Sequence, residues 1–117
     1  ITTTGDTYVT EIRDGVIQEY VIRPESFGLA RRSLADLQGG LPEDNARITL
    51  EILGGARGAA RDIVLLNAAA TIYIGKAARS LAEGVAMASH AIDSGAAKAQ
   101  LDRIVTYTRQ VGKGGAA

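Results

Sequence analysis

Residues that could do chemistry are few in this sequence. The chain has one histidine, His90, and no cysteine, which excludes a thiolate nucleophile and leaves only scattered carboxylates to hold a metal. His90 falls off the apolar stripe of its helix, so we expect a partly exposed side chain and not a base or a metal ligand. Glu43 and Asp44 are adjacent, but their place in the first turn of a predicted helix explains them through the helix dipole. Since no serine stands in a nucleophile-elbow context either, the residue types indicate no catalytic constellation.

Two segments invite a phosphate interpretation. Arg31 and Arg32 form the sharpest positive cluster of the chain; a phosphate site is one interpretation, and a solvated turn is the one we favour, because no anion-binding loop adjoins them. Gly54–Gly58, with the sequence GGARG, has the glycines of a phosphate-cradling loop. It lacks the preceding strand and the following Lys-Ser/Thr of such a loop. Glycines that end a helix with positive φ are the simpler interpretation.

The elements that must position these residues are organised around Arg61–Gly75, with the sequence RDIVLLNAAATIYIG. Within residues 63–74 only Asn67 and Thr71 are plainly polar, so a helix here would be apolar on nearly every side and belongs in the middle of a domain. A membrane span needs roughly 20 apolar residues, and this run is shorter. Asn67 and Thr71 share one face of the helix. We expect them to hydrogen-bond neighbouring backbone, with contact to a ligand as the alternative.

A β-hairpin is predicted over residues 7–22. Two runs rich in β-branched and aromatic residues flank Asp14-Gly15, a pair that favours a type I′ turn because both central residues need positive φ. Pairing across this turn gives three apolar cross-strand pairs: Ile12 with Ile17, Tyr8 with Val21, and Val9 with Tyr20. An isolated two-stranded hairpin is marginal in water, so we expect more sheet or helices against it.

Four helices are predicted after the hairpin, over about residues 43–53, 61–74, 81–94 and 96–111. Pro42 suits the first turn of the first helix, and Ser80 with Glu83 matches a capping box at the start of the third. Gly112–Ala117 is rich in small residues, and we expect it to be frayed. The predicted fold class is α/β: a β-hairpin followed by about four helices around a buried central helix.

The composition excludes several classes of protein. Basic and acidic residues balance at 13 each and are interleaved, so the charge footprint of a nucleic-acid binder is absent, and a membrane-surface role loses support for the same reason. No signal-peptide pattern opens the sequence, and we expect a cytoplasmic protein. A chain of this length makes one domain or part of one. It begins at Ile1 without a methionine and runs at once towards a predicted strand, which is typical of an interior segment of a longer polypeptide.

A series of motifs runs along the chain in a fixed order: TTT at 2–4, PESFGL at 24–29, DLQGG at 36–40, EDNA at 43–46, ILGGARG at 52–58, RDIVLLNAA at 61–69 and AIDSGAA at 91–97. In order and spacing, these motifs resemble the C-terminal third of the anthranilate phosphoribosyltransferase family. The resemblance implies that residues 1–117 are the C-terminal segment of an α/β domain of the nucleoside-phosphorylase-like type. The N-terminal helical domain and the first part of the α/β domain would lie outside these residues.

The family resemblance also implies an activity. Members transfer a phosphoribosyl group from phosphoribosyl pyrophosphate to the amine of anthranilate and release pyrophosphate, with assistance from Mg²⁺, in tryptophan biosynthesis. The enzyme would be a homodimer formed through its N-terminal domain. Such a reaction needs anion-binding backbone amides and carboxylates that hold Mg²⁺ on the pyrophosphate.

The chain departs from the family pattern by omission. The glycine-rich pyrophosphate loop, the anthranilate-binding arginine and the Asp-Glu metal pair all lie upstream in the family, the metal pair immediately before the position of Ile1. We therefore expect no catalytic, substrate-binding or metal-binding residue in this chain. Thr2, Thr3 and Thr4 would follow the metal pair directly and could orient it; a plain lead-in to the strand is the alternative.

Two classes of function remain open. In the first, these residues are part of a working phosphoribosyltransferase, with the remainder of the same enzyme as their partner, and are inactive alone. In the second, they belong to a non-catalytic relative that uses the same fold as a binding or assembly module. An independent soluble domain is the least favoured interpretation. An Asp-Glu pair and a glycine-rich loop upstream of Ile1 would indicate the enzyme.

Overall fold

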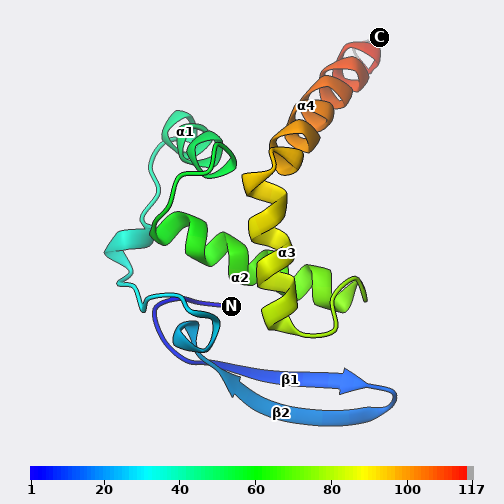
Figure 1. The fold of residues 1–117 in the computed structure, drawn as a ribbon. Helices are drawn as coiled ribbons and strands as arrows, with labels where there is room; N and C mark the ends of the chain where they lie inside the picture. The colour runs from blue at the N-terminus through cyan, green and yellow to red at the C-terminus, as the bar shows by residue number, and fades with distance from the viewer. Residues whose placement is uncertain (116–117) are drawn as a thin grey trace.

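The chain folds as a β-hairpin followed by helices, as the sequence predicts. A computed structural model describes residues 1–115 (Figure 1). The described residues form two strands, two 3₁₀ turns and four α-helices in this order: β1 (Thr7–Arg13), β2 (Val16–Ile22), η1 (Pro24–Phe27), η2 (Ala35–Leu37), α1 (Pro42–Leu53), α2 (Ala59–Ile74), α3 (Leu81–Asp93) and α4 (Ala96–Gly114). The mixed α/β class is confirmed, and the four predicted helices are present with shifts of a few residues at their ends.

The hairpin has the predicted register. β1 and β2 pair antiparallel along their whole length, with Tyr8 opposite Val21 and Ile12 opposite Ile17. Asp14 and Gly15 have φ values of 50° and 77°, the positive values that a type I′ turn requires at both positions. Figure 1 shows the ribbon along one side of the molecule, away from α1 and α4.

α2 and α3 cross in close contact and form the centre of the helical part. Their core consists of buried apolar side chains shared with α1: Ile52, Leu65, Ala88 and Ile92. Gly84 of α3 lies directly over Ala69 of α2, where an added Cβ would lie 2.7 Å from the Ala69 carbonyl oxygen. Only glycine permits this approach of the two backbones, so the crossing of α2 and α3 is set by this pair.

α2 is central, but only one side of it is buried within this chain. Leu66 and Ala69 are 2 % and 0 % exposed, whereas Ile74 is 77 % exposed. Asn67 and Thr71 also lie on the exposed side, so the expectation of burial on nearly every side is wrong for the described residues. The physical reason is that the core side chains of α1 and α3 meet α2 around Leu65, whereas elsewhere α2 meets only Ile1, at Asn67, and the hairpin, at Tyr73, across an open cleft.

Arg61 shows a second difference from expectation. The sequence places it at the polar boundary of the apolar run, yet its side chain is 2 % exposed, between α2 and α3. Its Nη2 donates to Asp93 Oδ2 and to Ser89 Oγ, both at 2.9 Å, and its Nη1 lies 2.8 Å from Asp93 Oδ1 as an ion pair. This pairing holds the pKa of Asp93 below its ordinary value, chiefly through the hydrogen bond from Arg61. A buried arginine therefore clamps the C-terminal end of α3 onto α2.

The helix ends follow the predicted signals with small corrections. Gly55 and Gly58 have positive φ between α1 and α2, as expected of glycines at helix ends. Ser80 caps α3 by accepting a hydrogen bond from the Glu83 N–H, as the predicted capping box requires. The Glu83 carboxylate, however, accepts from the N–H of Arg79 and not from that of Ser80.

α4 is longer than predicted. It continues to Gly114, so residues 112–114 of the expected frayed tail are helical, and residues 116–117 lie outside the described residues. Leu101 and Val105 are half-buried on one side of α4, whereas Ile104 is exposed. Within residues 1–115, no helix has the length and hydropathy needed to cross a membrane.

Candidate functional site

The threonines that open the chain fold into a tight turn. Thr2 Oγ1 lies 2.8 Å from Thr4 Oγ1 and accepts a hydrogen bond from the Thr4 N–H at 3.0 Å. The Thr2 N–H in turn donates to Thr7 Oγ1, at the start of β1. Threonine hydroxyls commonly form such local bonds with backbone groups. The turn is thus held by its own side chains, and it leads directly into the hairpin.

Thr3 is the buried member of this turn. Its side chain is 0 % exposed, and its Oγ1 has no hydrogen-bond partner among residues 1–115. Its carbonyl oxygen accepts from the Arg32 N–H at 2.9 Å. A buried polar atom without a partner is uncommon in a folded protein, so Thr3 Oγ1 is a hydroxyl for which this part of the chain supplies no acceptor.

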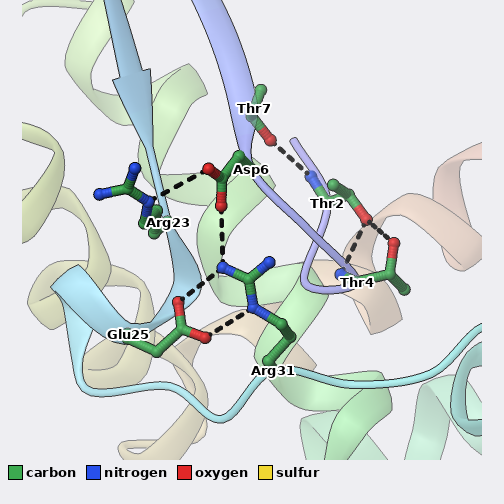
Figure 2. A network of polar contacts seen from close by, with 7 residues as sticks. All are labelled: Thr2, Thr4, Asp6, Thr7, Arg23, Glu25 and Arg31. Atoms are coloured by element: carbon green, nitrogen blue, oxygen red, sulfur yellow. Dashed lines mark hydrogen bonds and ion pairs between the residues drawn. The ribbon is translucent and has the colours of Figure 1, made fainter.

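A network of charged side chains fixes the base of the hairpin beside this turn (Figure 2). The Arg31 guanidinium donates to both carboxylate oxygens of Glu25, at 2.7 and 3.2 Å, and to Asp6 at 2.8 Å. Arg23 donates to the other Asp6 oxygen at 3.1 Å. Figure 2 shows Arg31 bonded to both carboxylates, with Arg23 approaching Asp6 from another side. Bidentate arginine–carboxylate pairs fix geometry as well as charge.

These ion pairs shift the ionisation of their members. The hydrogen bond from Arg31, followed by that from Arg23, lowers the pKa of Asp6 below its ordinary 3.8. Arg31 likewise lowers the pKa of Glu25 below 4.5, and the two carboxylates raise the pKa of Arg31. All of these groups are therefore charged at neutral pH.

The two adjacent arginines are neither a phosphate site nor a simply solvated turn. Arg31 is occupied as described, and Arg32 donates through Nε and Nη2 to one oxygen of Asp62, at 3.1 and 2.6 Å. Each guanidinium thus has its own carboxylate partner. Because Asp62 lies on α2, the Arg32 pair joins the connection after the hairpin to the central helix.

Asn67 ties the first residue to α2. Its Oδ1 accepts from the Ile1 nitrogen at 3.0 Å, and its Nδ2 donates to the Ile1 carbonyl oxygen at 2.8 Å and to the Ile63 carbonyl oxygen at 2.9 Å. Thr71 Oγ1 donates to the Asn67 carbonyl oxygen. The prediction that these two side chains bond to backbone is confirmed. Asn67 further positions the threonine turn, a role that sequence spacing did not reveal.

The inner face of the hairpin meets the C-terminal end of α2 through a polar cluster. Tyr73 donates to Glu11 Oε1 at 2.6 Å, accepts from Arg13, and its ring lies 5.4 Å beneath the Arg13 guanidinium. Tyr20 donates to Glu11 Oε2 at 3.0 Å. Burial, and then the bond to Glu11, raises the pKa of Tyr20. The cluster lies in an open cleft of about 1020 Å³ that Ile1 also lines.

The described residues do not form a metal site of their own. No group of three or more His, Asp or Glu side chains gathers in residues 1–115 to hold an ion, and His90 is exposed on α3, as expected. Glu43 and Asp44 lie in the first turn of α1, where Asp44 accepts from the Leu41 N–H. The donor set for Mg²⁺ is therefore not supplied by this part of the chain. The role of Thr2, Thr3 and Thr4 beside a metal pair stays a prediction.

The sequence matches a known protein family over most of its length. Residues 1–98 match the glycosyl transferase family, a/b domain. The chain is 49 % identical over 110 residues to an anthranilate phosphoribosyltransferase of Beijerinckia indica subsp. indica. This alignment covers 94 % of this chain and 32 % of that protein. It is 46 % identical over 111 residues to one of Thermoanaerobacter sp. strain X514, covering 95 % and 33 %.

The fold is similar to that of a solved relative. It matches the crystal structure of anthranilate phosphoribosyltransferase from Thermus thermophilus with a TM-score of 0.81 and 38 % sequence identity, over 91 % of this chain and 32 % of that one. The chain thus spans about a third of the length of the relatives it matches.

Proposed function

Because the chain belongs to the glycosyl transferase family through its a/b domain, we propose that these residues are part of an anthranilate phosphoribosyltransferase. The observation that carries the proposal is the match of almost the whole chain, at 49 % identity, to enzymes of that name. The complete enzyme would transfer the phosphoribosyl group of phosphoribosyl pyrophosphate to the amine of anthranilate and release pyrophosphate. It would act in tryptophan biosynthesis, in the cytoplasm and as a homodimer.

In this proposal the described residues act as scaffold. No constellation for phosphoribosyl transfer is present among residues 1–115, so the chain alone would be inactive. Mg²⁺ would neutralise the pyrophosphate while bound by carboxylates outside this chain, since the donor set here does not fit it. The threonine turn, tied to α2 by Asn67 and to the hairpin by Thr7, is suited to orienting a segment joined to it.

The proposal is tested with the complete enzyme that carries these residues. We expect consumption of anthranilate and release of pyrophosphate that both require phosphoribosyl pyrophosphate and Mg²⁺. A folded protein that binds neither substrate would contradict the proposal and would favour a binding or assembly module. In the same assay, Thr2→Val removes the hydroxyl that bonds Thr4; an unchanged kcat and Mg²⁺ dependence would exclude a role of the turn in orienting the metal pair.

A further inference from the structure

The hairpin carries an apolar stripe on the face that points away from the helices. Four side chains form this outer stripe, in two directly opposed cross-strand pairs: Tyr8 with Val21, and Ile12 with Ile17. They are exposed by between 42 % and 83 %. Such cross-strand pairs stabilise a sheet, and large apolar side chains that gather on an exposed surface mark sites of contact.

The opposite face of the same ribbon is already in use. Val9, Glu11 and Tyr20 alternate with the outer stripe along the strands and are half-buried. Glu11 is bonded to Tyr73 of α2 as well as to Tyr20. The helical part therefore contacts one face of the hairpin across an open cleft, whereas the four apolar side chains of the other face are exposed within the described residues. A two-stranded hairpin depends on packing for its stability, and here only its inner face has partners among the described residues.

The relatives carry enough additional chain to cover this face. They are about three times as long as the residues they share with this chain, and the first residues lie at the base of the hairpin, where the Thr2 N–H donates to Thr7 at the start of β1. In a chain of that length, polypeptide joined to Ile1 enters beside the hairpin. We propose that the outer stripe is the surface on which an apolar segment from the remaining two thirds of the same enzyme packs. This inference rests on the proposed function for the existence of that remainder.

The stripe chemistry fits such an internal contact. Both pairs of the stripe are wholly aliphatic or aromatic, and the one polar pair on this face, Thr10 with Glu19, lies between them and is exposed. The strand tip, at Arg13 and Val16, lies beyond the stripe. A covering segment would therefore bury Ile12 and Ile17 while leaving Val16, which is 57 % exposed and on the other face, accessible.

The test compares thiol accessibility at Ile17 and Val16 in the complete enzyme. Ile17→Cys and Val16→Cys variants are labelled with a maleimide under native and denaturing conditions, and the modified peptide is quantified by mass spectrometry. The two positions are neighbours of similar exposure in residues 1–115. A covered stripe slows native labelling of Ile17→Cys by about tenfold or more relative to Val16→Cys, because reaction then requires local opening. Ile12→Cys provides a second reporter if Ile17→Cys does not fold.

The outcomes separate this inference from the proposed function. Equal native-to-denatured labelling ratios at the two positions, in an enzyme that consumes anthranilate, overturn the inference and leave the function intact. Protection of Ile17→Cys that is lost on dilution overturns it as well, because a second copy of the enzyme would then be the cover. Concentration-independent protection supports the inference even in a protein without phosphoribosyl transfer, whose inactivity would contradict the proposed function alone.

Discussion

The helical part and the hairpin are held in place by different kinds of interaction. α2 and α3 share buried apolar side chains and bring their backbones into contact at Gly84 and Ala69. Apart from Ile22, which is buried at the end of β2, the hairpin meets the rest of the chain mainly through polar groups: the Tyr73–Glu11 bond at its inner face and the Arg31 ion pairs at its base.

The difference distinguishes the helical part, whose geometry is fixed by contacts within this chain, from the hairpin, whose position is fixed less firmly. Close-packed apolar contacts are short-ranged and tolerate little change in volume, so the crossing of α2 and α3 is fixed within residues 1–115. Exposed ion pairs and single hydrogen bonds contribute much less. The hairpin is therefore positioned mainly by weak, specific contacts, and its outer stripe is exposed in the described residues. Three changes test this contrast, beginning with the one of largest expected effect.

Gly84→Ala should destabilise the helical part. The new Cβ would lie 2.7 Å from the Ala69 carbonyl oxygen and 3.0 Å from its Cα, so the two helices must separate. Overpacking of this kind costs about 1–3 kcal/mol, which exceeds the gain in helix propensity. The measurement is the denaturant midpoint of the complete enzyme, followed by hydrogen exchange of the α2 and α3 amides.

Gly112→Ala is the matched control for that change. Gly112 also lies within a helix, α4, but an added Cβ would meet no described atom within 4 Å. The same substitution should there be neutral or stabilising, by up to about 1 kcal/mol, because alanine is the better helix former. If the Gly84→Ala variant were as stable as Gly112→Ala, the close contact of Gly84 with Ala69 would not be what sets the crossing of α2 and α3.

Tyr73→Phe should loosen the hairpin and leave the helical core unchanged. The substitution keeps the ring beneath Arg13 but removes the hydroxyl that donates to Glu11. Loss of one such hydrogen bond costs about 1 kcal/mol, or about a fivefold change in an opening equilibrium. Hydrogen exchange of the β1 and β2 amides in the complete enzyme measures this opening.

Tyr107→Phe, at an exposed position of α4, is the control for this change. If the two substitutions had equal effects on exchange, the Tyr73–Glu11 hydrogen bond would not be what holds the hairpin against α2.

The fold could be read from the sequence where its signals are local. Asp14-Gly15 sets the turn and the register, and Ser80 marks the start of α3. These features depend on residues a few positions apart, for which turn chemistry and capping are direct physical causes. The helix order and the α/β class followed from them and from apolar periodicity.

The contacts that position the site could not be read in this way. Arg61 pairs with Asp93 across 32 residues, and Arg31 with Asp6 across 25. In the sequence each is an ordinary charged residue, and its burial or pairing depends on how distant elements pack. The exposed side of α2 was mistaken for core for the same reason: composition shows that Ile74 is apolar, but not whether this chain contains what covers it.

Acidification should loosen the base of the hairpin, with the smallest effect of the three. Asp6 and Glu25 have pKa values lowered below 3.8 and 4.5 by Arg31. A carboxylate whose pKa is lower in the folded state stabilises that state fully above its unfolded pKa, and this stabilisation is lost as the pH falls through the folded value. Exchange of the hairpin amides, referred to the intrinsic rate at each pH, should therefore be constant above about pH 5 and rise below it.

Arg31→Gln distinguishes this network from other acid-sensitive groups. The variant lacks the cation that lowers both pKa values, so its hairpin should be looser at neutral pH and change less on acidification. The pKa of Asp93 is also lowered, but by Arg61, and this pair acts on α3, not on β1 and β2. Arg47→Gln, which breaks an exposed pair with Glu51 on α1, is the control and should leave the hairpin profile unchanged. If Arg31→Gln retains the full pH dependence of the wild type, the base of the hairpin is held by something other than its ion pairs. The claim that polar contacts hold the hairpin, whereas apolar packing holds the helices, would then be wrong for the base of the hairpin.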